Sequence, residues 1–490
     1  MNVALPLAYQ DLEPAPVWGA FALLNSTPRP SGQEERLRRV IEQLAQEKGA
    51  SARSDERGNL CVVLPGRNSS PGAPTVALQA HLDMVCQKRP EVAFNFESDA
   101  ISPRRDGDKI SATGTTLGAD NGIGVAYMLA LLDGVDSAHP PLELLFTVEE
   151  ETGLYGAALL DPALVSARRL INLDSEEDDE ITIGCAGGAG VALFLPIERE
   201  ARHENESAYR FTVGGLAGGH SGIQIGEPLG NALKIAGQIL DALRESVPAL
   251  RLSSFDGGTA HNAIPRDCHV AFATPAAQDG ALSTAWAHIS TAIETKWQDN
   301  EPNLVLSLEE AGAVEAPLSA ASTETVLGLV RALPHGVQKM SERWAGKVQT
   351  SSNMAEIKTE EGEVAFHISN RSFLACDIAD MQEHCATLGK NAGARVEMRD
   401  GYPGWEPRAH SPLRDQTAAA FANVSGKIPR IEVVHAGLEC GLLSEKLPGL
   451  DAVSFGPTIR GAHTPEEWVS IASVGRNWAI LQELLAALAL

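Results

Sequence analysis

The first 190 residues alternate between helical and strand-like patterns of apolar positions. Residues 17–50 predict two helices, which are separated by the breaker PRPSG and closed by Gly49. A further helix is predicted over NGIGVAYMLALLDG (121–134). Strands are predicted over four short apolar runs: LCVVL (60–64), TVALQA (75–80), LELLFTV (142–148) and RLINLD (169–174). Strands that alternate with helices predict an α/β layer built on a largely parallel sheet.

The pattern changes after the glycine-rich run CAGGAG at residues 185–190. Short runs in which polar and apolar residues alternate, such as YRFTVGGL and EVAFHISNRSF, are separated by helical patterns such as NALKIAGQILDALRES. From about residue 400 strand and turn segments return, and the chain ends in a helical pattern. We therefore expect a mostly parallel α/β domain in two parts, residues 1–187 and 401–490, interrupted by an inserted α+β domain at residues 188–400. The insert is long enough for two smaller units, although the sequence shows no repeat.

The composition describes an acidic globular protein. The 490 residues are 44% hydrophobic and 21% charged, and 64 acidic against 39 basic side chains give a net charge of −25. This charge argues against nucleic acid and anionic membranes as partners. Seven widely spaced cysteines without a C-x-x-C pair predict a reducing compartment. Because we also see neither a signal peptide nor an apolar run of about 18 residues, we expect a cytoplasmic protein.

Histidines and carboxylates follow the predicted strands. Each has an ordinary explanation when it is taken alone: His81 as a core histidine, Asp120 as a turn or helix-cap residue, and SEEDDE at 175–180 as a solvated loop. The ends of neighbouring strands in an α/β sheet, however, bring such residues together. The candidates at these strand ends and in a distant loop are His81, Asp83, Asp120, Glu149, Glu150, Glu151, Asp174 and His463.

The donor types in this set predict a metal site. Two histidines with three or more carboxylates and no thiolate suit Zn²⁺, with Mn²⁺ and Co²⁺ as alternatives. An excess of carboxylates also suits two divalent metal ions that share a bridging carboxylate and a water. The negative charge of the chain is consistent with a site that concentrates cations.

The order of these motifs resembles a known enzyme family. HLDMV, GTTLGADNGIG, EEETG, NLDSEE and the distant GAHTPEEW are similar to the dinuclear zinc metallopeptidase family that includes carnosinases, carboxypeptidase G and aminoacylase. QAHLDMVCQK, INLDSEE, GCAGG and HAGLECGL resemble its aminoacyl-histidine dipeptidase branch (cytosolic Xaa-His dipeptidase, peptidase D). The matches run from about residue 20 to the C-terminus. The resemblance implies a catalytic domain with an inserted lid domain, and the hydrolysis of short peptide substrates, Xaa-His dipeptides and β-Ala-His among them.

The resemblance also implies how two metal ions would be held. His81 and Asp174 would bind one ion, and Glu151 and His463 would bind the other. Asp120 would bridge the two. Metal ions in this arrangement would polarise the scissile carbonyl and make hydroxide available near neutral pH.

The three consecutive glutamates would not act alike. Strand alternation alone would place Glu149 and Glu151 on one face and Glu150 on the other. The family register E-E-x-G, counted back from the following glycine, selects Glu150 and Glu151 instead. By resemblance, Glu150 would be the general base, which takes a proton from the bridging water and later delivers it to the leaving amine. Asp83 would orient the imidazole of His81.

Candidates for substrate contact come from the inserted domain. By resemblance, His220 in GGLAGGHSG would stabilise the oxyanion, Asn262 in GGTAHNAIPRD would contact the substrate, and Arg371 in SNRSF would bind the substrate's C-terminal carboxylate. Glu439 in HAGLECG is expected near the cleft as a substrate contact rather than a metal ligand. Related lids reach a neighbouring active site across a dimer, so we expect a homodimer. A lid of this length could instead supply both halves within one chain.

Other functions fit the sequence less well. GGHSG lacks the G-x-S-x-G pattern of a serine hydrolase, and no cysteine lies in the setting of a thiol nucleophile. GCAGGAG lacks the G-x-G-x-x-G spacing of a nucleotide-binding loop. Three alternatives stay open: an N-acyl amino acid amidohydrolase, a carboxypeptidase, and a binding protein that kept the fold without the metal ions.

Overall fold

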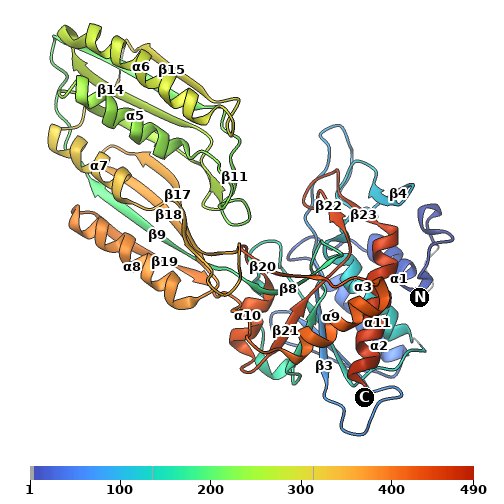
Figure 1. Ribbon diagram of the computed structural model, residues 1–490. Helices are drawn as coiled ribbons and strands as arrows, with labels where there is room; N and C mark the ends of the chain where they lie inside the picture. Colours follow the sequence, from blue (N-terminus) through green and yellow to red (C-terminus); the bar gives the residue numbers. More distant parts are fainter. Residues whose placement is uncertain (1–4, 135, 313) are drawn as a thin grey trace. The chain divides into compact units, whose positions relative to one another are not determined.

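A computed structural model describes residues 5–134, 136–312 and 314–490, and the chain forms two compact units (Figure 1). The first unit is made of Met1–Cys185, Trp405–Val433 and Leu438–Leu490. The second unit is made of Ala186–Gly404 and the short segment Val434–Gly437. The second unit is therefore an insertion into the first, and the chain returns to it once for four residues.

An eight-stranded sheet forms the centre of the first unit. Its strands are β1 (Ser51–Ser54), β2 (Leu60–Leu64), β3 (Val76–His81), β6 (Leu142–Thr147), β7 (Arg169–Asn172), β8 (Glu180–Cys185), β20 (Arg430–Val434) and β21 (Asp451–Ser454). They lie in the order β1-β2-β6-β3-β7-β21-β8-β20. The neighbours β6, β3, β7 and β21 run parallel, whereas β1 pairs antiparallel with β2, β2 with β6, and β8 with β21. The four strands that the apolar runs predict are all present, which confirms the expected α/β layer.

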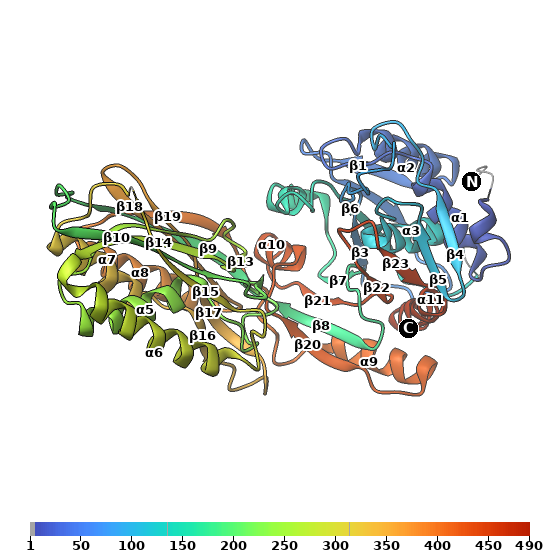
Figure 2. The same ribbon diagram turned by 90° about the horizontal axis from the view of Figure 1, so that it is seen from above.

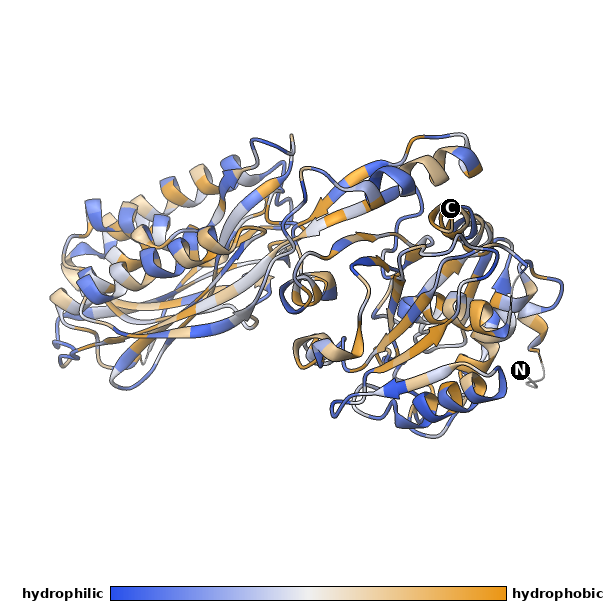
Figure 3. Cartoon of the chain, turned by 90° about the horizontal axis from the view of Figure 1, so that it is seen from below, coloured by the Kyte–Doolittle hydropathy of each residue, from blue (hydrophilic) through white to orange (hydrophobic). Residues whose placement is uncertain are grey.

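Helices pack around this sheet, and the predicted ones are confirmed. They are α1 (Ala15–Asn25), α2 (Glu35–Glu47), α3 (Ala119–Asp133), α4 (Tyr155–Ala158), α9 (Pro412–Ser425), α10 (Glu439–Lys446) and α11 (Ile471–Leu488), with 3-10 turns at Leu7–Tyr9 and Pro162–Leu164. Nearly every residue of α3 is buried, because α3 packs against both α1 and β3. In Figure 3 the strands of this sheet carry mainly the colour of hydrophobic residues, whereas α2 alternates between the two colours, as expected for a helix with one face in water.

A small antiparallel sheet completes the first unit. Its order is β22-β23-β5-β4, with β4 (Pro103–Asp106), β5 (Lys109–Ala112), β22 (Ile459–Arg460) and β23 (Trp468–Ser470). The loop between β22 and β23 carries His463. No sequence pattern predicted this sheet, because its strands are only two to four residues long.

An antiparallel sheet with helices forms the second unit, as the α+β texture predicts (Figure 2). The strands are β9 (Gly187–Pro196), β10 (Glu206–Gly214), β12 (Arg251–Gly257), β14 (Cys268–Pro275), β15 (Val305–Glu310), β16 (Gly336–Met340), β17 (Val348–Thr359), β18 (Glu363–Ser372) and β19 (Arg395–Tyr402). The helices are α5 (Ala232–Ser246), α6 (Asp279–Trp297), α7 (Ala320–Ala332) and α8 (Ala375–Asn391), with a 3-10 turn at Ala276–Gln278. A separate pair, β11 (Gly219–His220) and β13 (Ala263–Ile264), carries one candidate site residue.

The second unit consists of two halves with the same arrangement. From its two edges to its centre the large sheet reads β15-β10-β14-β12 and β19-β9-β18-β17. Each half has one helix before its central strand, α5 or α7, and one helix before its edge strand, α6 or α8. The halves meet through β12 and β17 and share one apolar core. The insert therefore contains the two smaller units that its length allows, although no sequence repeat marks them.

None of the helices in the described part of the chain combines the length and the apolar character that a membrane span requires.

Candidate active site

The parallel strands of the first unit bring three candidate segments to one edge of the sheet. His81 is the last residue of β3 and pairs with Thr147, the last residue of β6. The strand β7 lies on the other side of β3 and ends at Asn172. The three glutamates follow β6 after one residue, and Asp174 follows β7 after one residue. Because parallel strands end at the same edge, these side chains converge, as the sequence predicts.

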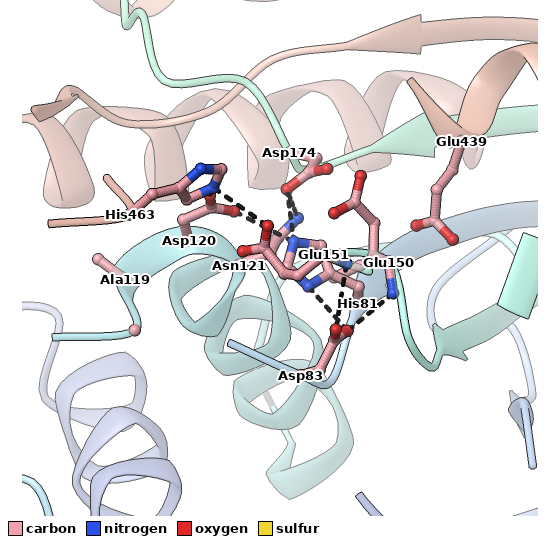
Figure 4. A network of polar contacts seen from close by, with 12 residues as sticks. His81, Asp83, Ala119, Asp120, Asn121, Glu150, Glu151, Asp174, Glu439 and His463 are labelled. Carbon is pink, nitrogen blue, oxygen red and sulfur yellow. Dashed lines mark hydrogen bonds and ion pairs between the residues drawn. The ribbon is translucent and has the colours of Figure 1, made fainter. Parts of the chain in front are cut away.

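Asp120 lies between two groups of candidate ligands (Figure 4). Its Oδ1 is 3.1 Å from Nε2 of His81, and its Oδ2 is 3.2 Å from Nε2 of His463. His81 Nε2 is also 3.3 Å from Oδ1 of Asp174, and His463 Nε2 is 3.1 Å from Oε2 of Glu151. The two oxygens of Asp120 therefore face two different imidazoles, and each imidazole has one further carboxylate beside it.

The same residues form three overlapping groups in which all donor atoms lie within 4.8 Å of one another. The groups are His81 with Asp120 and Asp174, Asp120 with Glu151 and His463, and His81 with Glu150 and Glu151. This donor set of imidazoles and carboxylates fits divalent ions such as Zn²⁺. One oxygen of Glu151, Oε1, is buried and has no hydrogen-bond partner in the described residues, which is consistent with a ligand position.

Glu149 belongs to none of these groups. It forms an ion pair with Arg57, and its φ of 51° ends the extended conformation of the strand. Strand alternation therefore stops before the three glutamates, and the chain turns so that Glu150 and Glu151 can reach the same group.

Asp83 organises the loops that carry two of these candidates. Its Oδ1 lies 3.3 Å from Nδ1 of His81. The same carboxylate accepts hydrogen bonds from the backbone N–H groups of Glu150 and Glu151, both at 3.1 Å. Asp83 is fully buried. It therefore connects the imidazole of His81 with the backbone of the neighbouring strand end.

Glu467 supports the loop that carries Asp120, and the sequence patterns assigned it no role, although it lies in the motif GAHTPEEW. Its buried carboxylate accepts hydrogen bonds from four consecutive backbone N–H groups, those of residues 117–120, at 2.6 to 3.3 Å. Because Glu467 follows His463 by only four residues, it connects the loop of His463 to the start of α3.

Burial, with a further contribution from neighbouring carboxylates, raises the pKa of two carboxyl groups of the site. Burial raises the pKa of Asp174 to about 6, although His81 opposes this shift. Burial also raises the pKa of Glu150 well above its usual range, with a further contribution from Asp174, Glu439 and Glu151. Hydrogen bonds that the imidazole of His463 donates to the carboxylates of Asp120 and Glu151 raise the pKa of His463 to about 11. A site with this surplus of negative charge favours cations.

Glu439 is a further buried carboxylate beside the candidate metal ligands (Figure 4). Its Oε2 accepts hydrogen bonds from Gln79 Nε2 and from Thr147 Oγ1, while its Oε1 has no partner among the described residues. Burial raises the pKa of Glu439 to about 8. Glu439 lies in none of the three ligand groups.

The acidic run at 175–180 is not simply solvated, contrary to the expectation. Glu177 pairs with Arg460 at 2.7 Å, and Asp178 pairs with Arg476. Arg430 lies 2.9 Å from Asp179 and 3.0 Å from Glu180. These arginines come from the C-terminal part of the chain, so the run is tied to that part by ion pairs.

His220 lies in the second unit, and its tautomer is fixed by the backbone. The N–H groups of Gly222 and Ile223 donate to its Nδ1 at 3.2 and 3.1 Å. Because Nδ1 accepts, the proton of the neutral ring is on Nε2. Burial and the nearby Arg371 lower the pKa of His220, which favours the neutral ring. The ring can therefore act as a hydrogen-bond donor near neutral pH.

Arg371 is buried in the second unit, so it is not a surface charge. It is 6% exposed, and its Nη1 donates to the hydroxyl of Tyr402 at 2.6 Å. Within the described residues it forms no ion pair with a carboxylate. Asn262 is exposed, and its backbone carbonyl accepts from the N–H of Ser221, the residue after His220, at 2.8 Å. The second unit therefore brings these three candidates to neighbouring loops and strands of its own.

Comparison with known proteins identifies the family. The model of peptidase family M20/M25/M40 matches residues 77–487. The chain is 40% identical to the cytosol non-specific dipeptidase of Escherichia coli over 475 residues, which cover 97% of this chain and 98% of the relative. It is also similar to the crystal structure of aminoacylhistidine dipeptidase from Vibrio alginolyticus, with a TM-score of 0.90, 38% identity and 97% of each chain covered.

A more distant structure shares the fold alone. The aminopeptidase PepT of Bacillus cereus matches with a TM-score of 0.56 at 16% identity, over 98% of this chain and 100% of that one. The family model alone spans well over half of the sequence, and the E. coli relative is matched nearly from end to end. The fold, the converging ligand groups and these matches agree: the chain belongs to peptidase family M20/M25/M40.

Proposed function

We propose that this protein is a cytoplasmic, metal-dependent dipeptidase that hydrolyses the peptide bond of short peptides, Xaa-His dipeptides included. The observation that carries the proposal is Asp120, whose two oxygens face two separate groups of histidine and carboxylate donors. A shared carboxylate of this kind is what a pair of divalent ions requires. The names of the E. coli and V. alginolyticus relatives support the dipeptide as substrate.

The chain's own residues would hold two divalent ions. His81 and Asp174 would bind the first, Glu151 and His463 the second, and Asp120 both. Zn²⁺ fits these donors, and Mn²⁺ or Co²⁺ would also fit. When bound, such ions polarise the scissile carbonyl and lower the pKa of the attacking water.

Glu150 would be the general base. It lies in the ligand group next to His81 and Glu151, and burial raises the pKa of its carboxyl well above the usual range. A raised pKa brings a carboxylate closer to the working pH, where a group can both take a proton and give it back. Glu150 would remove the proton from the attacking water and deliver it to the leaving amine. Asp83 would keep this carboxylate in place by holding the backbone of Glu150.

His220 would stabilise the negative oxygen of the tetrahedral intermediate. Two backbone N–H groups on Nδ1 leave its Nε2–H as a donor, and a pre-oriented donor is effective because it need not reorganise during the reaction. The lowered pKa of His220 keeps the ring neutral at the pH where the reaction runs.

Ionisable side chains of the protein that bind the two ends of the substrate would select dipeptides. The buried guanidinium of Arg371 would bind the C-terminal carboxylate, with Asn262 as a further contact. Glu439 has one unpartnered oxygen beside the ligand groups and would bind the free α-amine. A substrate that needs both charges close to the scissile bond is a dipeptide rather than an acylated amino acid or a long peptide.

For the number of chains in the active protein, a homodimer stays a prediction. The duplicated halves of the second unit favour the alternative in which one chain carries both halves of the lid. Sedimentation of the active, metal-loaded protein distinguishes one chain from two.

A metal-reconstitution assay on a substrate panel tests the proposed function. The metal-free protein would be loaded with Zn²⁺, Mn²⁺ or Co²⁺ and supplied with β-Ala-His, Gly-His, Ala-Leu, a tripeptide and N-acetyl-Leu. We expect fast cleavage of the dipeptides, slower cleavage of the tripeptide and no cleavage of the acetylated substrate. Fast hydrolysis of N-acetyl-Leu with none of the dipeptides would contradict the proposal and favour an N-acyl amino acid amidohydrolase.

A further inference from the structure

The loop of residues 29–34, between α1 and α2, contacts three of the loops that carry the candidate metal ligands. The sequence pattern predicted only a helix breaker there. We propose that this loop, which we call the anchor loop, positions the ligands of both metal ions and so sets the metal affinity of the site. The proposal rests on the proposed function, since it concerns the same pair of metal ions.

Arg29 joins the strand end of His81 to the start of α3. Its guanidinium is buried and donates from Nη1 to the carbonyls of Leu82 and Asp83, both at 2.8 Å. From Nη2 it donates to the carbonyl of Gly118 at 2.6 Å. The flat guanidinium can serve three carbonyls on two loops at once, which the single ammonium of a lysine cannot reproduce.

Gly118 makes room for this contact. Its φ is +69°, and a Cβ at this position would overlap the guanidinium of Arg29 and approach Met84 Sδ to 2.9 Å. Asp120 follows two residues later. The position of Asp120 is therefore coupled to Arg29 through a backbone at which a larger residue would displace the guanidinium.

Ser31 and Glu34 extend the anchor loop to the glutamate turn. Ser31 Oγ donates to Oδ2 of Asp83 at 2.7 Å, and this oxygen also accepts from the N–H of Glu151. Glu34 Oε1 accepts from the N–H of Glu149 at 2.9 Å and from the N–H of Gly32 at 3.0 Å. Two residues of the anchor loop, Ser31 and Glu34, thus hold the glutamate turn, Ser31 through Asp83 and Glu34 directly.

The anchor loop affects the positions of the metal ligands rather than the packing of the hydrophobic core. Hydrogen bonds to groups that orient metal ligands commonly change metal affinity by roughly 10- to 100-fold when they are removed. The anchor loop makes such bonds to Asp83 and to the backbone beside Asp120. Its residues are positioning residues, because none of them belongs to a ligand group.

Ser31→Ala tests the proposal with little risk to folding, since it removes one hydroxyl. We expect the apparent metal dissociation constant, measured by competition with a chelator, to rise roughly 10-fold. The visible absorption spectrum of the Co²⁺-loaded protein should change, kcat for Gly-His should fall, and KM should stay within about twofold. Ser31→Thr, which keeps the hydroxyl, should restore the metal affinity. Ser26→Ala is the matched control, because Ser26 Oγ donates to the carbonyl of Leu23 in the preceding helix and to no other group among the described residues.

Arg29→Lys is the stronger perturbation, and we expect a loss of metal affinity larger than that of Ser31→Ala. If both variants fold, bind metal as tightly as the wild type and keep its Co²⁺ spectrum, the anchor loop has only a structural role and the proposal is overturned. The metal readouts are independent of the substrate. A wild type that binds two ions without cleaving dipeptides would therefore contradict the proposed function while leaving this test intact.

Discussion

Replacing Glu150 by glutamine separates the general base from the metal ligands. The amide keeps the size of the side chain and the backbone hydrogen bond to Asp83, but it cannot take a proton. General-base catalysis contributes about 10²- to 10⁴-fold, so kcat should fall by this factor. The change corresponds to about 2.7–5.4 kcal/mol in the activation free energy. Metal content should not fall, because the groups centred on Asp120 do not include Glu150.

The assay combines steady-state kinetics with elemental analysis of the same samples. We expect Glu150→Gln to lose its turnover of Gly-His while it keeps two metal ions per chain. Folding should not suffer, because a neutral amide is compatible with the neighbouring carboxyl groups of Glu151, Asp174 and Glu439, which disfavour a charge on Glu150. Glu149→Gln is the matched control. Its partly exposed ion pair with Arg57 contributes at most about 1 kcal/mol, so its activity should stay within about twofold.

Two results would refute this reasoning. If Glu149→Gln is the inactive variant and Glu150→Gln is active, the roles of the consecutive glutamates are shifted by one residue. If Glu150→Gln loses a metal ion together with its activity, Glu150 is a ligand of the group that it shares with His81 and Glu151. Glu151→Gln, by contrast, is expected to lose metal, because Glu151 is a proposed metal ligand.

Three further predictions concern other groups. Glu439→Gln should raise KM at least about tenfold for dipeptides with a free amine, with metal content unchanged, and an unchanged KM for Gly-His would contradict amine binding. His220→Ala should lower kcat by about 10²- to 10³-fold with metal content unchanged, and a variant with normal kcat would exclude the oxyanion role. Burial and Lys234 lower the pKa of His335 to about 4, so the unfolded chain binds more protons than the folded chain between pH 6.5 and 4. The contribution of His335 to stability should therefore fall by about 2 kcal/mol from pH 7 to pH 5, and urea unfolding of His335→Gln should lack this part of the pH dependence.

Sequence patterns predicted the elements that bury a regular apolar face or an entire apolar run. The apolar runs of β2, β3, β6 and β7, and the helical spacing of α2, α5 and α11, were visible because each element buries one face or the whole of itself. The exposed helix α6 was not predicted, because only Leu282 of its residues is buried. The two halves of the second unit were also invisible, since they share an arrangement of elements and no repeated sequence.

Only part of the candidate site could be predicted from the sequence. Strand ends pointed to His81 and Asp174, but the choice among the three glutamates needed the family register, because the positive φ of Glu149 breaks the alternation. The partners of Arg29 lie 53 to 89 residues away in the sequence, and those of Glu467 about 350 residues away. No local pattern encodes such contacts, since they depend on how distant loops meet in the folded unit.

The central claim is that Asp120 serves two metal ions, and metal content tests it most directly. Protein purified without chelators and supplied with Zn²⁺ should contain two transition-metal ions per chain by elemental analysis, and Asp120→Ala should contain fewer than one. A wild-type content below one ion per chain would contradict the account and favour a binding protein that kept the fold without the metal ions.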